Sequence, residues 1–212
     1  MRRRAATSFL SACAITLVAA GCASVEAERA EPAGQDVAEA GSGSTPADAR
    51  GLTARLVDAE GAEVGTVTLS ETGRGTRVSV KVAGLPPGFH GFHVHAVGLC
   101  EPDSVSPTDP SMTGDFLSAG GHLGAAEADH PHHAGDLPSL YIGQSGAGKL
   151  RTVTDAFTLA DLTDDDGSAV MVHAGPDNFA NIPERYAPEG PDQMTRATGD
   201  SGGRIACGPV EG

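Results

Sequence analysis

Alternation between apolar and polar residues with a period of two is the feature that most restricts the fold of this chain. In the run TRVSVKV (76–82), valine occupies every second position, with Arg77, Ser79 and Lys81 between the valines. Successive side chains of a strand point to opposite faces, so this run predicts a half-buried β-strand. The 212 residues include 29 Gly and 14 Pro, which favour short strands joined by turns over long helices.

Seven further segments have strand-like patterns: 52–57, 64–69, 91–97, 139–142, 150–157, 169–173 and 204–208. Eight short strands separated by turn residues predict an all-β fold, an eight-stranded antiparallel Greek-key sandwich or barrel. Two connections, 99–138 and 174–203, are too long for hairpins. Long connections in a compact β domain predict functional loops.

The first 50 residues predict an export signal and a tether. Three arginines (2–4) precede an apolar stretch (12–20), which is the layout of a secretory signal. The run LVAAGC (17–22) resembles a bacterial lipoprotein cleavage box, which predicts removal of residues 1–21 and lipidation of Cys22. The alternatives are an ordinary cleaved signal with an incidental cysteine and, with a poorer match, a twin-arginine signal. Residues 22–50 are rich in small and acidic residues and predict a flexible tether. The domain 51–212 is then expected on the outer face of the cell membrane.

The charge of the chain excludes several partners. Its formal net charge is −14, and loss of the three leader arginines makes it −17. Phosphate surfaces repel such a chain, so we expect no nucleic-acid partner and membrane contact only through the lipid anchor. The sequence does not decide between a monomer and a homodimer.

Two cysteines remain for the folded domain. Cys13 lies in the leader and Cys22 is the predicted lipidation site, which leaves Cys100 and Cys207. Export to an oxidising compartment favours a disulfide between them, and two separate buried thiols are the alternative.

All eight histidines lie between residues 90 and 173. His93 and His95 are two residues apart on a predicted strand, so both imidazoles point to one face and can reach one metal ion. Three other segments add His122, a cluster of His130, His132, His133 and Asp136, and finally His173. Four imidazoles suit copper, whereas three His and one Asp suit tetrahedral zinc. The sequence supplies both sets only if one histidine serves both metals.

Five ordered stretches resemble the copper/zinc superoxide dismutase family over residues 51–212. They are GFHVHAVG (91–98), SAGGH (118–122), HAGDL (133–137), VMVHAGPD (170–177) and GGRIACG (202–208). The segment 172–183 looks most like the actinobacterial lipoprotein members of this family.

The resemblance implies a copper and a zinc site that share His122. Copper would be held by His93, His95, His122 and His173, and zinc by His122, His130, His133 and Asp136. The resemblance also implies a Cys100–Cys207 disulfide, a linking carboxylate at Asp177 and a structural histidine at His90. The implied reaction is dismutation of two superoxide ions to dioxygen and hydrogen peroxide, with His122 and Arg204 as catalytic residues.

Several expectations remain open at this point. The short turn 130–133 departs from the family's usual spacing, so zinc is either bound there, with His132 as an alternative ligand, or absent from a copper-only enzyme. The loop 181–200 looks like the family's channel-lining segment. In a chain of net charge −17, Arg204 would need support from other cations, for which the candidates are Lys149, Arg151, Arg185 and Arg196. The alternative function is a non-catalytic copper-binding or copper-delivery lipoprotein on the same fold.

Overall fold

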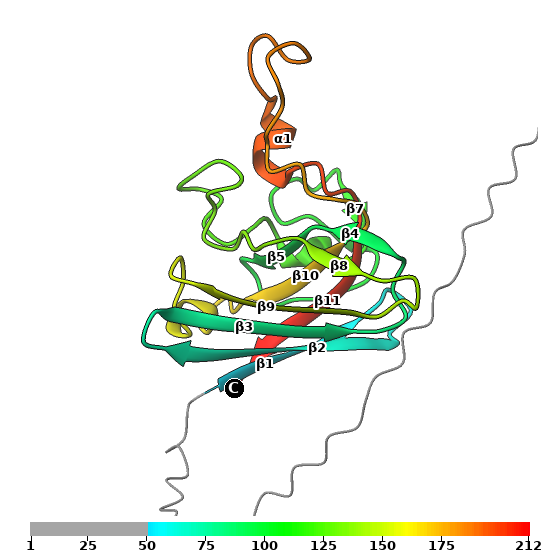
Figure 1. Ribbon diagram of the computed structural model, residues 1–212, viewed down its shortest axis with the longest axis vertical. Coiled ribbons are helices and arrows are strands. Elements are labelled where there is room, and N and C mark those ends of the chain that lie inside the picture. Colours follow the sequence, from blue (N-terminus) through cyan, green and yellow to red (C-terminus); the bar gives the residue numbers. More distant parts are fainter. Residues whose placement is uncertain (1–50) are drawn as a thin grey trace, which may run out of the picture. The chain divides into compact units, whose positions relative to one another are not determined.

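The computed structural model describes residues 51–212, and it shows an antiparallel β-barrel (Figure 1). The predicted signal (1–21), Cys22 and the predicted tether (22–50) lie outside the described residues. The main sheet consists of β1 (Gly51–Val57), β2 (Glu63–Thr72), β3 (Gly75–Val82), β4 (Gly88–His90), β5 (Phe92–His95), β8 (Leu140–Ile142), β9 (Gly148–Thr154), β10 (Ala169–His173) and β11 (Arg204–Glu211). Their order in the sheet is β4-β8-β9-β3-β2-β1-β11-β10-β5. The prediction of an all-β antiparallel barrel is confirmed.

Gly91 allows the sheet to close on itself. β4 pairs with β8 at one edge of the sheet and β5 pairs with β10 at the other, yet only Gly91 separates β4 from β5 in the chain. A Cβ atom at this position would clash with the hydroxyl group of Ser201, so only glycine fits where the chain passes between the edges. The two edges are thereby brought together, and the sheet forms a nearly closed barrel.

Aliphatic side chains fill the interior of the barrel, as expected for a chain without Trp. On β3 the predicted alternation is present, because Val78 and Val80 are buried while Lys81 is exposed. Val67 of β2 is buried beside Val80, its cross-strand partner. Full burial of one such side chain contributes about 1.5–3 kcal/mol. Because side chains alternate along a strand, the residues between these buried valines point away from the barrel.

The sequence predicts eight strands, and the structure has eleven. The additional strands are β4 and a separate small hairpin of β6 (Ser104–Val105) and β7 (Thr113–Gly114). All three contain only two or three residues, which is too short for a pattern of period two to be visible in the sequence. The hairpin and a 3-10 helix, η1 (Leu117–Ala119), lie within the first predicted long loop.

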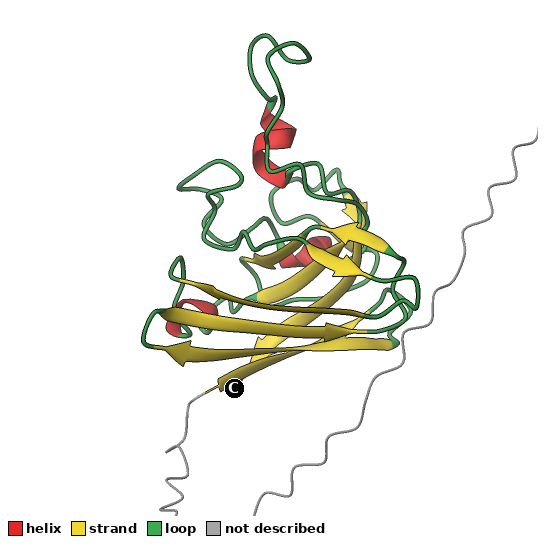
Figure 2. Cartoon of the chain, viewed as in Figure 1, coloured by secondary structure: helices red, strands yellow, loops and turns green. Residues whose placement is uncertain are grey.

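The second predicted long loop contains a short helix, α1 (Gln193–Thr198), seen in Figure 2. The Asp192 carboxylate caps this helix by accepting a hydrogen bond from the Thr195 backbone N–H at 2.8 Å, and Gly199 ends it in a left-handed conformation (φ 59°). The sequence indicates only a loop here because six residues give too few turns for apolar periodicity. A further 3-10 helix is η2 (Ala160–Leu162). Within residues 51–212, the length and hydropathy of every helix fall short of a membrane span.

Candidate metal centre

Two neighbouring strands supply three histidines to the centre of the molecule. β5 is buried at every position and contains His93 and His95. β10 pairs with β5 and ends at His173. A register shift between Val172 and His173 redirects the end of β10, so that His173 lies opposite Arg204 at the start of β11.

His122 completes a group of four buried histidines. A backbone bridge joins His122 to His95 of β5. One ring nitrogen from each of His93, His95, His122 and His173 lies within 4.8 Å of the other three. Four imidazole nitrogens around one point form a donor set that suits copper. We call these residues the copper group.

Backbone carbonyls hold two rings of the copper group in a defined tautomer. His95 Nδ1 donates to the carbonyl of Gly120 at 2.9 Å, and His173 Nδ1 donates to the carbonyl of Gly202 at 3.2 Å. A carbonyl can only accept, so Nδ1 holds the proton in each ring and Nε2 is free to bind a metal. The two Nε2 atoms lie 3.4 Å apart.

A second group of potential ligands shares His93 and His122 with the copper group. The ligand atoms of His93, His122, His130 and Asp136 also lie within 4.8 Å of one another. His122 directs Nδ1 toward this group, 2.8 Å from Asp136 Oδ1. His133 Nδ1 lies 3.2 Å from His122 Nδ1 and 3.2 Å from Asp136 Oδ2. The short turn at 130–133 therefore brings both of its predicted ligands to the carboxylate of Asp136. We call the predicted set His122, His130, His133 and Asp136 the zinc group, and we count His93, whose Nε2 faces Asp177, with the copper group.

Two buried ring nitrogens show that these residues fit metal ions. Among the described residues, His93 Nδ1 and His130 Nδ1 have no hydrogen-bond partner. His130 Nδ1 lies 2.9 Å from Asp136 Oδ2, but without the geometry of a hydrogen bond. A buried polar atom is rarely left unpaired. Two close ligand atoms that do not bond to each other have the arrangement expected around a shared ion, so the two groups are suited to hold Cu and Zn.

Asp177 connects the copper group and the zinc group through hydrogen bonds to one histidine of each. Its Oδ2 accepts a hydrogen bond from His93 Nε2 at 2.9 Å, and its Oδ1 accepts one from His130 Nε2 at 2.8 Å. The backbone N–H of Phe179 also donates to Oδ1 at 2.7 Å. Gly199, at the end of α1, packs so closely on Asp177 and His130 that a Cβ atom would clash with both. One buried carboxylate thus sets the ring orientation in both groups.

Two histidines lie outside both groups. His132 lines a separate hollow next to the zinc loop and supplies no ligand atom to either group. His90 is buried, with Nδ1 2.7 Å from the carbonyl oxygen of His173 and Nε2 2.9 Å from that of Pro86. His90 therefore holds the backbone at the end of β10, where a copper-group residue is attached.

Burial favours the neutral form of the imidazoles in the copper group. Desolvation, reinforced by neighbouring positive groups, holds the pKa of His95 and His173 well below the ordinary value. Desolvation also lowers the pKa of His122 to about 4, although the hydrogen bond to Asp136 opposes this shift. Neutral imidazole is the form that binds a metal ion. At neutral pH these imidazoles are thus in the form that metal binding requires.

His130 has the opposite tendency, which predicts that zinc binding releases a proton. Burial alone lowers the pKa of His130, but the carboxylates of Asp136 and Asp177 outweigh burial and raise this pKa to about 9. Zinc must displace that proton. From pH 9 down toward pH 7, we expect the zinc affinity of the metal-free protein to fall about tenfold per pH unit. Calorimetric titrations with zinc in buffers of different ionisation enthalpy should show about one proton released.

A His130→Asn variant provides the control for this proton release. The variant should bind zinc more weakly and lose the additional pH dependence between pH 7 and pH 9. In the metal-free protein, the pKa of His130 is higher in the folded state than in the unfolded chain, where it is about 6.5. The ion pairs of His130 therefore stabilise the fold fully below a pH of about 6.5, and this stabilisation is lost as the pH rises through about 9. A zinc affinity that is constant over this pH range would contradict the assignment.

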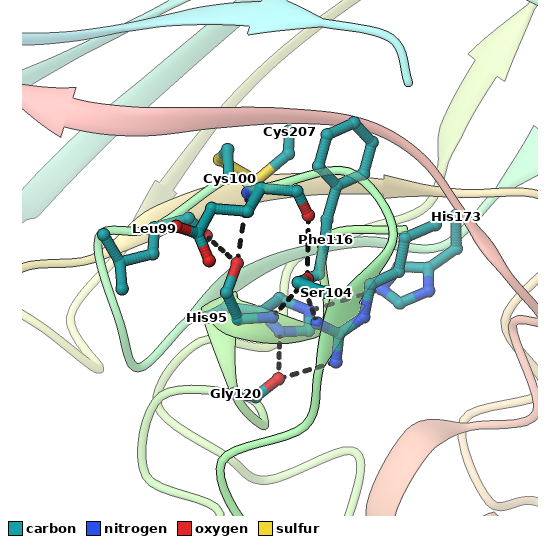
Figure 3. The surroundings of a disulfide bond; sticks show 11 residues. His95, Leu99, Cys100, Ser104, Phe116, Gly120, His173 and Cys207 are labelled. Carbon is teal, nitrogen blue, oxygen red and sulfur yellow. Dashed lines mark hydrogen bonds between the residues drawn. A yellow bond between two sulfur atoms is a disulfide. The ribbon is translucent and has the colours of Figure 1, made fainter. Parts of the chain in front are cut away.

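Arg204 is anchored next to the copper group by backbone carbonyls of a loop. Figure 3 shows Phe116 and Gly120 of this loop beside the Cys100–Cys207 disulfide. The Arg204 guanidinium donates to the backbone carbonyls of Phe116 and Gly120, the latter at 2.6 Å. The Gly120 carbonyl also accepts the hydrogen bond from His95, so one backbone oxygen positions a ligand and the arginine. Cys100 and Cys207 form a disulfide with their Cα atoms 5.6 Å apart. This bond ties the loop to β11, and the prediction of a disulfide is confirmed.

A pocket of about 780 Å³ gives access to the copper group. His95, His122, His173 and Arg204 line it together with residues of α1 and of the loop 112–117. Among residues 51–212, Arg204 is the one cationic residue in its wall, and two carboxylates, Asp115 and Asp200, are also present. Part of the segment 181–200 thus lines the channel.

The four cations suggested as helpers of Arg204 are absent from this pocket. Lys149 and Arg151 lie on β9 and line a groove on the outer face of the barrel. Arg185 stacks on Tyr186 with 4.6 Å to the ring centroid, and Arg196 pairs with Asp129 at 3.5 Å. The sequence does not place these four cations, because distance along the chain does not reveal which side of a strand or loop a side chain occupies.

The backbone acceptors of the site were not predicted from the sequence. The carbonyls of Phe116 and Gly120 hold Arg204, and Phe116 itself has a left-handed backbone conformation (φ 59°). Every residue has a backbone carbonyl, so residue types do not indicate which carbonyl accepts a hydrogen bond from a functional side chain. The pair Gly120-Gly121 is the one signal in the sequence that points to unusual backbone geometry here.

A buried centre for two metals in a β-barrel, with one histidine common to both groups and an arginine in the access pocket, defines a class of redox metalloprotein. A family model described as copper/zinc superoxide dismutase (SODC) matches residues 63–210. A superoxide dismutase [Cu-Zn] of Mycolicibacterium paratuberculosis is 45% identical over 187 residues, covering 84% of this chain and 80% of the relative. The protein of the same name from Mycobacterium tuberculosis is 44% identical over 170 residues, covering 76% and 70%. The chain belongs to the copper/zinc superoxide dismutase family.

Solved structures agree with this assignment. The Cu/Zn superoxide dismutase from Brucella abortus matches with a TM-score of 0.60 and 31% identity, covering 76% of this chain and 99% of that one. A SOD-like protein from Bacillus subtilis matches with a TM-score of 0.58 and 29% identity, covering 74% and 96%.

Proposed function

We infer that this protein is a superoxide dismutase, an oxidoreductase that converts two superoxide ions to dioxygen and hydrogen peroxide. The observation that carries this conclusion is the group of four buried imidazoles at the base of a pocket that also contains Arg204. The test is superoxide consumption, followed by pulse radiolysis, by metal-loaded and metal-free protein. Equal rates for the two samples would remove the proposal and leave the non-catalytic copper-binding alternative.

His122 and Arg204 have distinct tasks in this reaction. Bound copper would supply one-electron redox chemistry, and bound zinc would have a structural role. His122 directs Nδ1 to the zinc group, so its Nε2 faces the copper group and can hold a proton whenever it is not a ligand. Arg204 attracts the anionic substrate to the pocket.

The charge of Arg204 remains available to a substrate. Burial lowers the pKa of Arg204 to about 10, so its guanidinium is still cationic at neutral pH. Its hydrogen-bond acceptors are neutral carbonyls, and no carboxylate of residues 51–212 lies within 4.0 Å of it. A cation that is held in place but not neutralised can attract an anion in the pocket.

Replacing Arg204 with alanine should lower the rate but keep the metals. We expect the second-order rate constant for superoxide to fall about 10- to 100-fold, because a local attraction for the anion is lost. Copper and zinc content per chain should stay unchanged. Arg204→Lys should recover part of the rate, since it retains a positive charge. Loss of copper from Arg204→Ala would assign the residue a structural role instead.

We also propose that the protein is exported and attached to the outer face of the cell membrane through Cys22. The support is the arrangement of arginines, apolar stretch and cysteine in residues 1–22. Labelling of cells with a radioactive fatty acid should mark the wild-type protein and leave a Cys22→Ser variant unlabelled. Equal labelling of the two, or no labelling of either, would contradict the proposal.

A further inference from the structure

Positive charge is concentrated on one face of this acidic protein. Residues 51–212 contain nine Lys and Arg residues. Five of them lie at outward positions of β1, β3 and β9, which are three of four neighbouring strands in the order β9-β3-β2-β1. They are Arg55, Arg77, Lys81, Lys149 and Arg151. We call the outward side of β1, β2, β3 and β9 the basic face.

The register of the strands places these cations in three rows across the basic face. The first row runs from Arg55 through Thr66 and Lys81 to Lys149. The second row ends in Ser79 and its partner Arg151, and the third contains Arg77. Strands are about 4.8 Å apart and alternate residues on one strand are about 6.8 Å apart, so the rows cover roughly 15 by 14 Å.

Carboxylates meet the basic face at its borders and not within its rows, namely Glu63 at the start of β2 and Glu211, the β11 partner of Thr53. Its other outward positions are mostly hydroxyl residues, Thr53, Thr66, Thr68, Ser70 and Ser79, and none of the outward positions in the three rows is Asp or Glu. Arg55 pairs with Glu63 at the border at 3.9 Å. The four other cations have no carboxylate of residues 51–212 within 4.0 Å.

This arrangement is unfavourable for folding by itself. Lys81 and Lys149 are direct cross-strand partners, and both side chains are exposed. Like charges directly opposite each other destabilise a sheet. Together with Arg151, they line a groove of about 680 Å³ in which Thr66, Thr68 and Ser79 provide hydroxyl donors. This surface therefore presents cationic groups without a carboxylate partner together with hydroxyl groups. Phosphate oxygens accept hydrogen bonds from both kinds of donor.

We propose that the basic face docks on the anionic headgroups of a phospholipid membrane. Clustered Lys and Arg near such a surface each contribute about a fivefold gain in binding. The net charge of the chain repels this surface only weakly, because physiological salt screens charges beyond about 8 Å. The outward positions of the basic face hold no aromatic side chain to stack on bases, which disfavours a nucleic acid as the occupant.

Two features of the fold agree with a membrane as the partner. β1 begins at Gly51, whose partner Ser70 belongs to the basic face, so the chain enters the domain at the edge of this face. α1, which lines the access pocket, lies at the far side of the barrel from β1, β2 and β3 (Figure 1). Docking would therefore leave the pocket open to solvent. The proposal depends neither on dismutase activity nor on lipid attachment.

Vesicle binding by the metal-loaded full chain tests this proposal. Vesicles of phosphatidylcholine alone are compared with equimolar phosphatidylcholine and phosphatidylglycerol. We expect stronger binding to the anionic vesicles, weakened by salt, and a roughly 30-fold loss of this preference in Lys81→Gln/Lys149→Gln. The matched control is Arg185→Gln/Arg196→Gln, which changes the net charge equally on other surfaces and should keep the preference.

Three results would overturn the proposal. Equal losses in the two double variants would show a net-charge effect only. Equal binding to both vesicle types would show that the leader or a lipid, and not the basic face, makes the contact. Competition for the groove by inorganic phosphate without any binding to anionic vesicles would assign a soluble oxyanion in place of the membrane. Lys81→Gln/Lys149→Gln should remain folded with a slightly higher Tm and unchanged activity, because it relieves like-charge repulsion far from the copper group.

Discussion

Replacing His122 with alanine is expected to lower superoxide dismutation at least about 100-fold. Loss of a residue that only orients a metal ligand already costs 10- to 100-fold, and His122 belongs to both ligand groups. Its Nδ1 lies against Asp136 and His133, while its other nitrogen faces the copper group. One substitution therefore removes a ligand from two sites. Metal content per chain and pulse-radiolysis rates measure the effect.

A neighbouring histidine provides the matched control for this variant. His132 belongs to the same loop but supplies no atom to either group, so His132→Ala should retain both metals and the rate. The circular dichroism spectrum of His122→Ala should match the wild type, since the disulfide and the aliphatic core are untouched. Full activity in His122→Ala, or equal losses in both variants, would refute the role of His122.

Removal of the disulfide is expected to lower the free energy of unfolding by about 4–5 kcal/mol. Cys100 and Cys207 are separated by 107 positions, and the entropy lost by an unfolded chain rises with the size of the closed loop. For a domain of this size the change corresponds to a fall in Tm of roughly 10–20 °C. Denaturant unfolding of a Cys100→Ser/Cys207→Ser variant measures it.

The disulfide has a second role, because it also positions residues of the metal centre. It ties β11 to the loop that supplies the carbonyls of Phe116 and Gly120 to Arg204. At a temperature where the variant is folded, we expect a reduced rate because Arg204 is less well placed. Cys22→Ser leaves this bond intact and should unfold like the wild type. A loss of less than 1 kcal/mol in the double variant would contradict the entropic argument.

Net charge is a poor guide to the surfaces of this protein. A value of −14 predicts repulsion from every phosphate surface. The fold separates the charges, because alternate positions of β3 and β9 direct lysines and arginines to one side of the barrel. The same alternation keeps Lys149 and Arg151 out of the wall of the access pocket, although both are candidates for that place in the sequence analysis.

The sequence by itself determined the chemistry of this protein and the class of its fold. Alternation along 76–82 and similar runs predicted the barrel, and the spacing of His93 and His95 predicted two rings on one strand face. These properties are local, since strand periodicity and ligand type are set by residues close together in the chain. The family resemblance added the ligand sets from short, ordered motifs.

Only the tertiary structure decided how distant segments meet. The register shift at His173, the closure at Gly91 and the carbonyl of Gly120 between His95 and Arg204 arise from pairing of strands and loops far apart in sequence. Backbone acceptors and strand register have no signature in residue type. The placement of charge on one face follows from the same pairing. Alternate side chains of each strand point to one side, and they form a continuous surface only when the strands lie next to each other.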